Sequence, residues 1–307
     1  MMSDTLRLGT RGSALARAQT AGVAARLKEL NPALVIEEVI VRTRGDAMLG
    51  SPIHELGGKG LFVKEIEDAL LGGEIDAAVH SLKDLPSELP EGLVLAAIPE
   101  REEPWDALVS RGGESVRGLA PGSRIGTSSL RRIAQIRRYR SDLEIVELRG
   151  NVDTRLDKVA AGEAEAAVLA LAGLKRLGLV ERATESLAPE LMLPAAGQGA
   201  LAVETRGDDA ATRSLVEELE HAETKRAVMA ERAVMARLEG GCQLPLAVFA
   251  ENRKNGFCIK ARLASVDGAR MVEKERTGRP DNAMSMAEDL AEDVLSSGGA
   301  EILRDAR

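Results

Sequence analysis

Arginine placement is the first feature of the sequence that suggests chemistry. Six arginines stand where an apolar, strand-like run passes into a turn or a helix-like segment: Arg11, Arg131, Arg132, Arg149, Arg155 and Arg176. In open parallel sheets, ligands bind beyond the carboxyl ends of the strands, where helix N-termini present unpaired N–H groups to anions. A guanidinium group holds a carboxylate through two parallel hydrogen bonds, which an ammonium group does poorly. The six arginines therefore predict a site for a ligand that carries several carboxylates.

Hydroxyl side chains and a local excess of positive charge accompany these arginines. Ser13 follows the first of them, and Thr127 and Ser129 precede the second. Residues 124–155 hold eight arginines against four acids, although the formal net charge of the whole chain is −8. A basic segment in an acidic chain favours a local anionic ligand over general affinity for nucleic acid. A solvated surface is the alternative for any one arginine, and we expect it for three: Arg137, Arg138 and Arg140.

The dipeptide Lys83-Asp84 ends a third strand-like segment, residues 76–84. A lone carboxylate among arginines can stabilise a developing cation and assist proton transfers. A surface ion pair, which stabilises little, is an equally good interpretation of these two residues taken alone.

Two cysteines occur in 307 residues, which is too few for a disulfide framework. Cys242 follows a glycine pair and precedes a proline in LEGGCQLPL, so we expect it on a loop. No helix N-terminus or neighbouring histidine would activate it as a nucleophile, so the pattern predicts an accessible thiol and leaves its partner open. Cys258, in GFCIKARL, is predicted to be a buried strand residue. The three histidines form no metal-ligand pattern, and we expect no metal.

The glycine-rich segment LGGKG, residues 56–60, lacks the hydroxyl residue that follows the lysine in a phosphate-binding loop. A flexible loop or lid that contains Lys59 is the better interpretation. Phe62 is expected either in the core of the following helix or over a flat ligand.

The composition is that of an ordinary soluble protein, with 44% hydrophobic and 29% charged residues. No apolar run approaches the ~20 residues that a membrane span needs. The start, MMSDTLRLGT, does not resemble a secretory signal, so a cytoplasmic chain without a membrane partner is expected.

Short apolar runs alternate with helical patterns in the first half, which indicates parallel α/β architecture. The segment 8–19 resembles 125–135, and 73–85 resembles 162–175, so two α/β lobes of similar plan are predicted. Asn-Gly and Asp-Gly turns between alternating segments after residue 245 predict hairpins in a third, α+β unit.

The ordered motifs match a known family. GTRGSALARAQ, RTRGD, GGKGLFVKE, AAVHSLKDLP, GTSSLRR, LRGNVDTRL, AGLKRLGL, PAAGQGAL and LEGGCQLP follow one another across nearly the whole chain. In these motifs the sequence resembles the porphobilinogen deaminase family. The resemblance implies two α/β lobes like those of type II periplasmic binding proteins, plus a small C-terminal α+β domain that carries the cofactor cysteine. The implied boundaries are 1–99 with 200–217 for lobe 1, 105–193 for lobe 2, and 222–307 for the C-terminal domain.

The resemblance also implies an activity. Members of the family are transferases of tetrapyrrole biosynthesis that carry a dipyrromethane cofactor, joined by a thioether to a loop cysteine that corresponds to Cys242, and we expect this chain to be a monomer. Four porphobilinogen molecules are deaminated and added head to tail to this primer, and hydroxymethylbilane is released by hydrolysis. Porphobilinogen and the growing oligopyrrole chain are the implied partners.

Site residues carry over by motif. Asp84 would be the catalytic carboxylate, which stabilises the cation left by loss of ammonia. The residues implied for the cofactor carboxylates are Lys83, Ser129, Arg131, Arg132 and Arg155. Those implied for the incoming pyrrole and the elongating chain are Arg11, Ser13, Thr127, Arg149 and Arg176. Lys59 and Phe62 would end a mobile loop that covers the site.

A solute-binding protein for a polycarboxylate is the alternative function, because such proteins share the two-lobed plan. They are usually exported, and they have no use for a tethering thiol or for Asp84. A nucleic-acid binder is disfavoured by the net charge and by the scarcity of stacking aromatics, which make up 2% of the chain.

Overall fold

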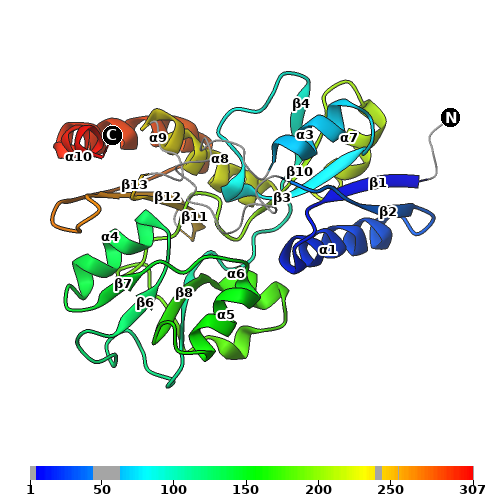
Figure 1. The fold of residues 1–307 in the computed structure, drawn as a ribbon. Helices are drawn as coiled ribbons and strands as arrows, with labels where there is room; N and C mark the ends of the chain where they lie inside the picture. Colours follow the sequence, from blue (N-terminus) through cyan, green and yellow to red (C-terminus); the bar gives the residue numbers. More distant parts are fainter. Residues whose placement is uncertain (1–4, 44–62, 239–243, 255, 307) are drawn as a thin grey trace. The chain divides into compact units, whose positions relative to one another are not determined.

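A computed structural model describes residues 5–43, 63–238, 244–254 and 256–306 of the chain. The chain divides into two compact units (Figure 1). The first contains Met1–Glu102 and Ala200–Lys225, and the second contains Glu103–Gly199 and Arg226–Arg307. The chain therefore passes from one unit to the other three times, at 102/103, 199/200 and 225/226.

The first unit is built on a five-stranded sheet of order β2-β1-β3-β10-β4. Its strands are β1 (Thr5–Thr10), β2 (Val35–Ile40), β3 (Ala77–Ser81), β4 (Leu93–Ala97) and β10 (Leu201–Arg206). β1 pairs in parallel with β2 and β3, whereas β10 is antiparallel to both β3 and β4. Helices α1 (Ala14–Leu30) and α7 (Ala210–Glu217) pack on one face, and α3 (Lys64–Leu71) packs on the other.

Ser13 ahead of an apolar helical pattern, and the Asn-Pro pair at 31–32, predict a helix that Ser13 opens and that continues to about Leu30. The N-cap of α1 is Ser13, whose side chain accepts a hydrogen bond from the Ala16 N–H at 3.3 Å and so satisfies one orphan donor of the first turn. Val23 and Leu27 lie in the core beneath it, and the helix ends at Leu30, before Asn31 and Pro32. The predicted boundaries of this helix are confirmed.

The second unit contains a five-stranded sheet of order β7-β6-β8-β5-β9. Its strands are β5 (Asp106–Ser110), β6 (Arg124–Gly126), β7 (Glu144–Val146), β8 (Ala166–Ala170) and β9 (Glu185–Ser186). β6 pairs in parallel with β7 and β8, and β5 is antiparallel to β8 and β9. Helix α4 (Leu130–Tyr139) packs on one face, and α5 (Val152–Ala160) and α6 (Leu171–Arg176) pack on the other. A 3₁₀ turn, η3 (Val180–Arg182), follows α6.

The internal repeat is confirmed by the strand orders. Reading each sheet from its edge, β2, β1 and β3 correspond to β7, β6 and β8, and the fourth strand is antiparallel in both sheets. In both cases that fourth strand, β10 or β5, is the first strand after the chain has entered the unit from the other one.

A three-stranded antiparallel sheet of order β11-β12-β13 completes the second unit. Its strands are β11 (Leu246–Arg253), β12 (Gly256–Ala264) and β13 (Met271–Gly278). One face packs against α8 (Ala222–Arg237) and α9 (Ala283–Val294). The short helix η4 (Pro280–Asn282) precedes α9, and η5 (Leu295–Gly299) and α10 (Ala300–Asp305) follow it. The Asp-Gly turn joins β12 to β13 as predicted, with Gly268 at φ +74° and its N–H donating to the Ser265 carbonyl.

Several predicted boundaries are wrong in detail. β3 ends at Ser81, so Lys83 and Asp84 lie in a following 3₁₀ turn, η2 (Leu82–Asp84). The apolar run AAVLALAG, residues 166–173, predicts a single strand before Arg176, but β8 ends at Ala170 and Arg176 is the last residue of α6. The charged residues 212–241 have a continuous helical pattern, but they form two helices: α7 ends at Glu217 and α8 begins at Ala222, shortly before the chain passes from one unit to the other.

The expected fold class is confirmed: two α/β sheets of matching topology and a small C-terminal sheet covered by helices. The residue boundaries of three domains stay a prediction. In the described part of the chain, no helix is both long and apolar enough to cross a membrane.

Candidate functional site

In the first unit, the predicted residues gather at the carboxyl ends of two neighbouring strands. Arg11 and Ser13 follow β1, and Lys83 and Asp84 follow β3. The turn after β3 is held in place by the Leu82 N–H, which donates to the Ala200 carbonyl at 3.1 Å. Because parallel strands end at one edge of their sheet, the two turns share that edge.

The Asp84 carboxylate is exposed. Within the described residues it has no hydrogen-bond or ion-pair partner. The surface ion pair considered from the sequence is therefore not formed with any described residue. A carboxylate left open at a strand end is available to a ligand, which is what a catalytic role requires.

In the second unit, the turn between β6 and α4 carries Thr127 and Ser129. Thr127 is buried, its N–H donates to the Val146 carbonyl, and its hydroxyl accepts from the Ser129 N–H at 3.2 Å. Ser129 is the N-cap of α4, but its side chain makes no capping hydrogen bond. The Ser129 hydroxyl is therefore not committed to the first turn of its own helix.

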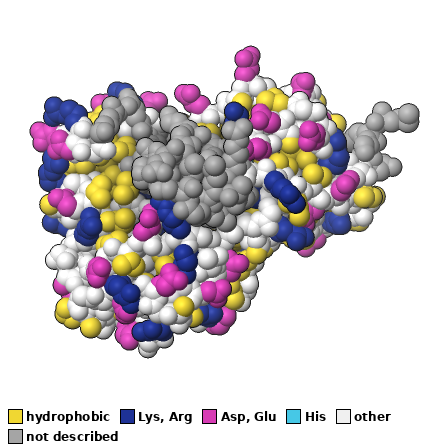
Figure 2. Space-filling view, viewed as in Figure 1, with side chains coloured by type: hydrophobic (Ala, Val, Ile, Leu, Met, Phe, Trp, Pro, Cys, Tyr) yellow, Lys and Arg dark blue, Asp and Glu magenta, His cyan; other side chains and the backbone are white. Residues whose placement is uncertain are grey.

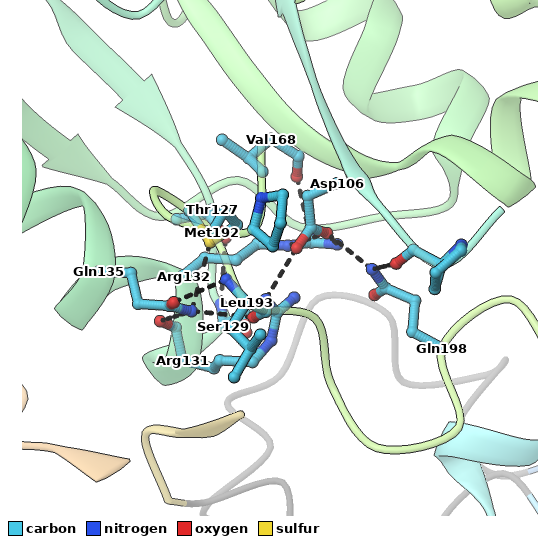
Figure 3. Close-up of polar contacts among 12 residues, drawn as sticks. Asp106, Thr127, Ser129, Arg131, Arg132, Gln135, Val168, Met192, Leu193 and Gln198 are labelled. Atoms are coloured by element: carbon cyan, nitrogen blue, oxygen red, sulfur yellow. Dashed lines mark hydrogen bonds and ion pairs between the residues drawn. The ribbon is translucent and has the colours of Figure 1, made fainter. Parts of the chain in front are cut away.

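Arg131 and Arg132, in the first turn of α4, are buried and share the carboxylate of Asp106 (Figure 3). Arg131 Nη1 donates to Asp106 Oδ2 at 2.7 Å and also to the Leu193 carbonyl. Arg132 donates from Nε and Nη2 to Asp106 Oδ1 at 3.0 and 2.7 Å, and from Nη1 to the Val168 carbonyl. Asp106 is completely buried at the start of β5, so these bonds are shielded from water.

The cluster carries more positive than negative charge. Two guanidinium groups face one carboxylate, and Arg131 Nε is a buried donor without a hydrogen-bond partner among the described residues. Burial lowers the pKa of Arg131 and the Arg132 charge lowers it further, whereas Asp106 opposes both. An incoming anion would stabilise the charged form, so the cluster fits a ligand with carboxylate groups such as the dipyrromethane.

The remaining arginines follow the two flanking strands. Arg149 follows β7 and pairs with Glu147, its Nε lying 2.8 Å from Glu147 Oε1. Arg155 lies in the first turn of α5, where its N–H donates to the Asn151 carbonyl. Arg176 Nη2 donates to the Gly199 carbonyl at 2.6 Å. All three therefore lie beyond the carboxyl ends of β7 and β8, the neighbours of β6.

Sequence reasoning missed Asp106 and Gln198. Gln198 Nε2 donates to Asp106 Oδ1 at 3.1 Å and to the Pro104 carbonyl at 2.7 Å (Figure 3). One signal was present: an aspartate opens the apolar strand DALVS, and a buried carboxylate needs a charged or hydrogen-bonding partner. The sequence could not say which of its many arginines that partner would be.

Two of the three arginines expected on a solvated surface are hydrogen-bonded. Arg140 donates to the Val116 and Leu119 carbonyls and pairs with Asp142. Arg137 donates to the Val266 carbonyl, between β12 and β13, at 3.0 Å. Arg137 and Arg140 therefore hydrogen-bond to loops of the second unit. Arg138, the third of these arginines, is exposed as expected.

Three predicted residues, Lys59, Phe62 and Cys242, lie outside the described residues. The described residues contain no group of three or more His, Cys, Asp or Glu side chains able to hold a metal ion. On the face shown in Figure 2, Lys and Arg side chains alternate with Asp and Glu side chains over the described residues. A continuous basic surface of the kind that binds nucleic acid is not visible on the described part of that face.

Cys258 is a buried residue of β12, as predicted, and burial raises the pKa of its thiol to about 11. Because the folded state holds this proton more tightly, its contribution to stability is complete below the unfolded pKa, near 9, and is lost as pH rises through about 11.

We expect Cys258 to resist iodoacetamide at pH 8 in the native protein and to react fully in urea, as measured by peptide mass. Equal labelling rates in the two states would contradict the assignment.

Comparison with known proteins identifies the family to which this sequence is similar. The porphobilinogen deaminase dipyromethane cofactor binding domain matches residues 6–214, and the porphobilinogen deaminase C-terminal domain matches 225–296. A porphobilinogen deaminase of Syntrophus aciditrophicus is 48% identical over 298 residues, which is 97% of each chain. One of Syntrophobacter fumaroxidans is 46% identical over 305 residues, which is 99% of each chain.

Similarity to solved structures is weaker. The effector-binding domain of BenM with benzoate is 15% identical, with a TM-score of 0.41, over 70% of this chain and 89% of that chain. An arginine-specific periplasmic binding protein of Salmonella typhimurium is 15% identical, with a TM-score of 0.40, over 71% of this chain and 92% of that chain. The assignment rests on the sequence relatives and the two domain matches, which together cover nearly the whole chain. The chain belongs to the porphobilinogen deaminase family.

Proposed function

We propose that the chain acts as a hydroxymethylbilane synthase, a transferase that deaminates four porphobilinogen molecules and joins them head to tail on a dipyrromethane primer. The observation that supports it best is the buried pair Arg131–Arg132, which shares one carboxylate and leaves a donor of Arg131 without a partner among the described residues. Each pyrrole of such a chain brings an acetate and a propionate, so the ligand presents the anionic groups that this cluster lacks.

The binding roles follow the family motifs. The carboxylates of the primer would be held by Lys83, Ser129, Arg131, Arg132 and Arg155. The residues that would bind the incoming substrate and the growing chain are Arg11, Ser13, Thr127, Arg149 and Arg176. Lys59 and Phe62 would contribute from a covering loop. When bound, the dipyrromethane supplies the pyrrole end to which the first substrate unit is joined.

Asp84 would be the catalytic carboxylate. Each addition breaks the C–N bond of the substrate aminomethyl group, releases ammonia, and forms a C–C bond to a pyrrole carbon that then loses its proton. Loss of ammonia leaves a cation delocalised over the pyrrole ring, and an adjacent carboxylate lowers the free energy of the transition state that leads to it. Asp84 can also accept the pyrrole N–H hydrogen bonds and assist the proton transfers, because its oxygens are not paired with any described residue.

Cys242 would be the tether of the primer, through a thioether. We expect Cys242→Ser to yield a folded chain without the primer, because a serine hydroxyl is a far weaker nucleophile than a thiolate. Intact mass measures this directly: the unchanged chain should exceed its sequence mass by two linked pyrrole units, and the variant should not. Cys258→Ser is the matched control and should keep the added mass. Added mass on Cys242→Ser would refute the tether.

The reaction itself is tested by incubating the purified chain with porphobilinogen and following ammonia release and the tetrapyrrole product. Four ammonia molecules per product are expected. Binding of porphobilinogen without ammonia release would instead support the polycarboxylate-binding alternative, which family membership does not favour. We also propose a monomeric, cytoplasmic enzyme with the three-domain boundaries given above; few cysteines in a chain with a buried thiol suit a reducing compartment.

A further inference from the structure

Glu231, in the middle of α8, is a completely buried carboxylate that the proposed chemistry does not use. Its Oε2 accepts a hydrogen bond from the Gly197 N–H at 2.6 Å, and its Oε1 accepts one from the Ala250 N–H at 2.8 Å. A buried carboxylate is stable only if hydrogen bonds replace its hydration, and these backbone donors supply them. Glu231 therefore joins α8 and β11 to the segment that contains Gly197.

That segment is a tight turn with a defined geometry. Gly197 and Gly199 have φ of +72° and +87°, in the left-handed region that favours glycine, and the Gln198 N–H donates to the Ala195 carbonyl. The Val248 N–H of β11 donates to the Pro194 carbonyl at 3.2 Å. The C-terminal sheet and α8 thus hold this turn at two points.

Two groups of the turn contact residues of the candidate site. The Gln198 side chain donates to Asp106, the carboxylate shared by Arg131 and Arg132. The Gly199 carbonyl accepts from Arg176 Nη2 at 2.6 Å. Three consecutive residues therefore make three different contacts: Gly197 to Glu231, Gln198 to Asp106 and Gly199 to Arg176.

We propose that Glu231 is a positioning residue for substrate binding, which fixes the turn 197–199 and thereby the orientation of Arg176. The proposal rests on the substrate-binding role proposed for Arg176. Loss of the Gly197 hydrogen bond would leave the turn free to shift, and the Gly199 carbonyl would shift with it. A misplacement of about 1 Å at a group that orients substrate can cost about 10²-fold in rate.

The test is a double-mutant cycle on the holoenzyme with Glu231→Gln, Arg176→Gln and both together. Glu231→Gln keeps the shape but cannot accept both N–H groups, and we expect KM for porphobilinogen to rise about tenfold with a smaller change in kcat. If Glu231 acts through Arg176, the double variant should have the kcat/KM of Arg176→Gln alone. Losses that multiply would overturn the proposal and leave Glu231 a purely structural residue.

Control variants separate the causes. Glu220→Gln removes another carboxylate that accepts a backbone N–H, that of Ile98 at 3.0 Å, in the first unit, and KM should not change. An unchanged KM in Arg176→Gln would contradict the role of Arg176 and not the positioning contact. If Glu231→Gln does not fold, Gln198→Ala loosens the same turn and should raise KM in the same direction; an unchanged KM there would overturn the proposal.

Discussion

Replacing Asp84 by Asn is expected to lower the rate of porphobilinogen consumption by about 10²–10⁴-fold while leaving the fold intact. The substitution keeps the size of the side chain and removes the negative charge that would stabilise the cationic transition state. Stability should not change, because Asp84 is exposed and has no hydrogen-bond or ion-pair partner among the described residues. Steady-state ammonia release measures the first effect, and urea unfolding measures the second.

Glu88→Gln is the matched control for that experiment. Glu88 is an exposed carboxylate four residues further along the same segment, and its loss should leave the rate unchanged. Rates should be compared on chains whose mass shows that the primer is attached, so that a defect in primer assembly is not read as a defect in turnover. Acid–base groups usually contribute about 10²-fold or more to the rate. If the rate of Asp84→Asn is within a few-fold of that of the unsubstituted chain, Asp84 does not have the assigned role.

Of the substitutions proposed here, Asp106→Asn should cause the largest decrease in the free energy of unfolding. Asp106 is the carboxylate that Arg131 and Arg132 share, and its side chain is fully buried. Neutralising it leaves two buried guanidinium groups without their counter-charge, which is expected to lower the free energy of unfolding by about 3–5 kcal/mol. Domains are stable by only ~5–15 kcal/mol, so the urea midpoint should fall markedly.

Asp142→Asn provides the comparison for this prediction. It removes an exposed carboxylate that pairs with Arg140, and a pair with one exposed partner stabilises less than a fully buried one. Primer content should also fall in Asp106→Asn, because Arg131 and Arg132 would lose the acceptor that orients them, whereas Asp142→Asn should keep it. Equal urea midpoints for the two variants would show that the buried cluster does not stabilise the fold as described.

Much of the local structure could be predicted from short stretches of sequence. The serine before α1, the Gly-Thr pair that recurs at 9–10 and 126–127 ahead of α1 and α4, and the Asp-Gly turn between β12 and β13 each act over a few residues. Cys258 was correctly placed in a buried strand by its apolar neighbours. Strand ends were predicted less well, because where a strand stops depends on how far its neighbours extend beside it.

The sequence predicted the class of ligand that the site would bind, but not the contacts among the site residues. Arginines after strands indicated an anionic ligand, and the structure places those of the second unit beyond the ends of β6, β7 and β8. The sequence did not predict which of these arginines are buried or which carboxylates they pair with. Arg131 and Arg132 were expected to be open to ligand, yet each is largely buried against a carboxylate more than 20 residues earlier in the chain.

The sequence by itself determined the motif order, the paired α/β plan and the types of side chain offered to a polycarboxylate ligand, because turn chemistry and hydrophobic period are encoded locally. Tertiary structure alone decided that Asp106 lies between two arginines, that Gln198 reaches it, and that Glu231 holds the neighbouring turn. These contacts join β5, α4, the 194–199 segment and α8. These contacts form only when distant segments pack together. Packing buries the charged groups, and a buried charge without a partner is so unfavourable that the fold must provide one.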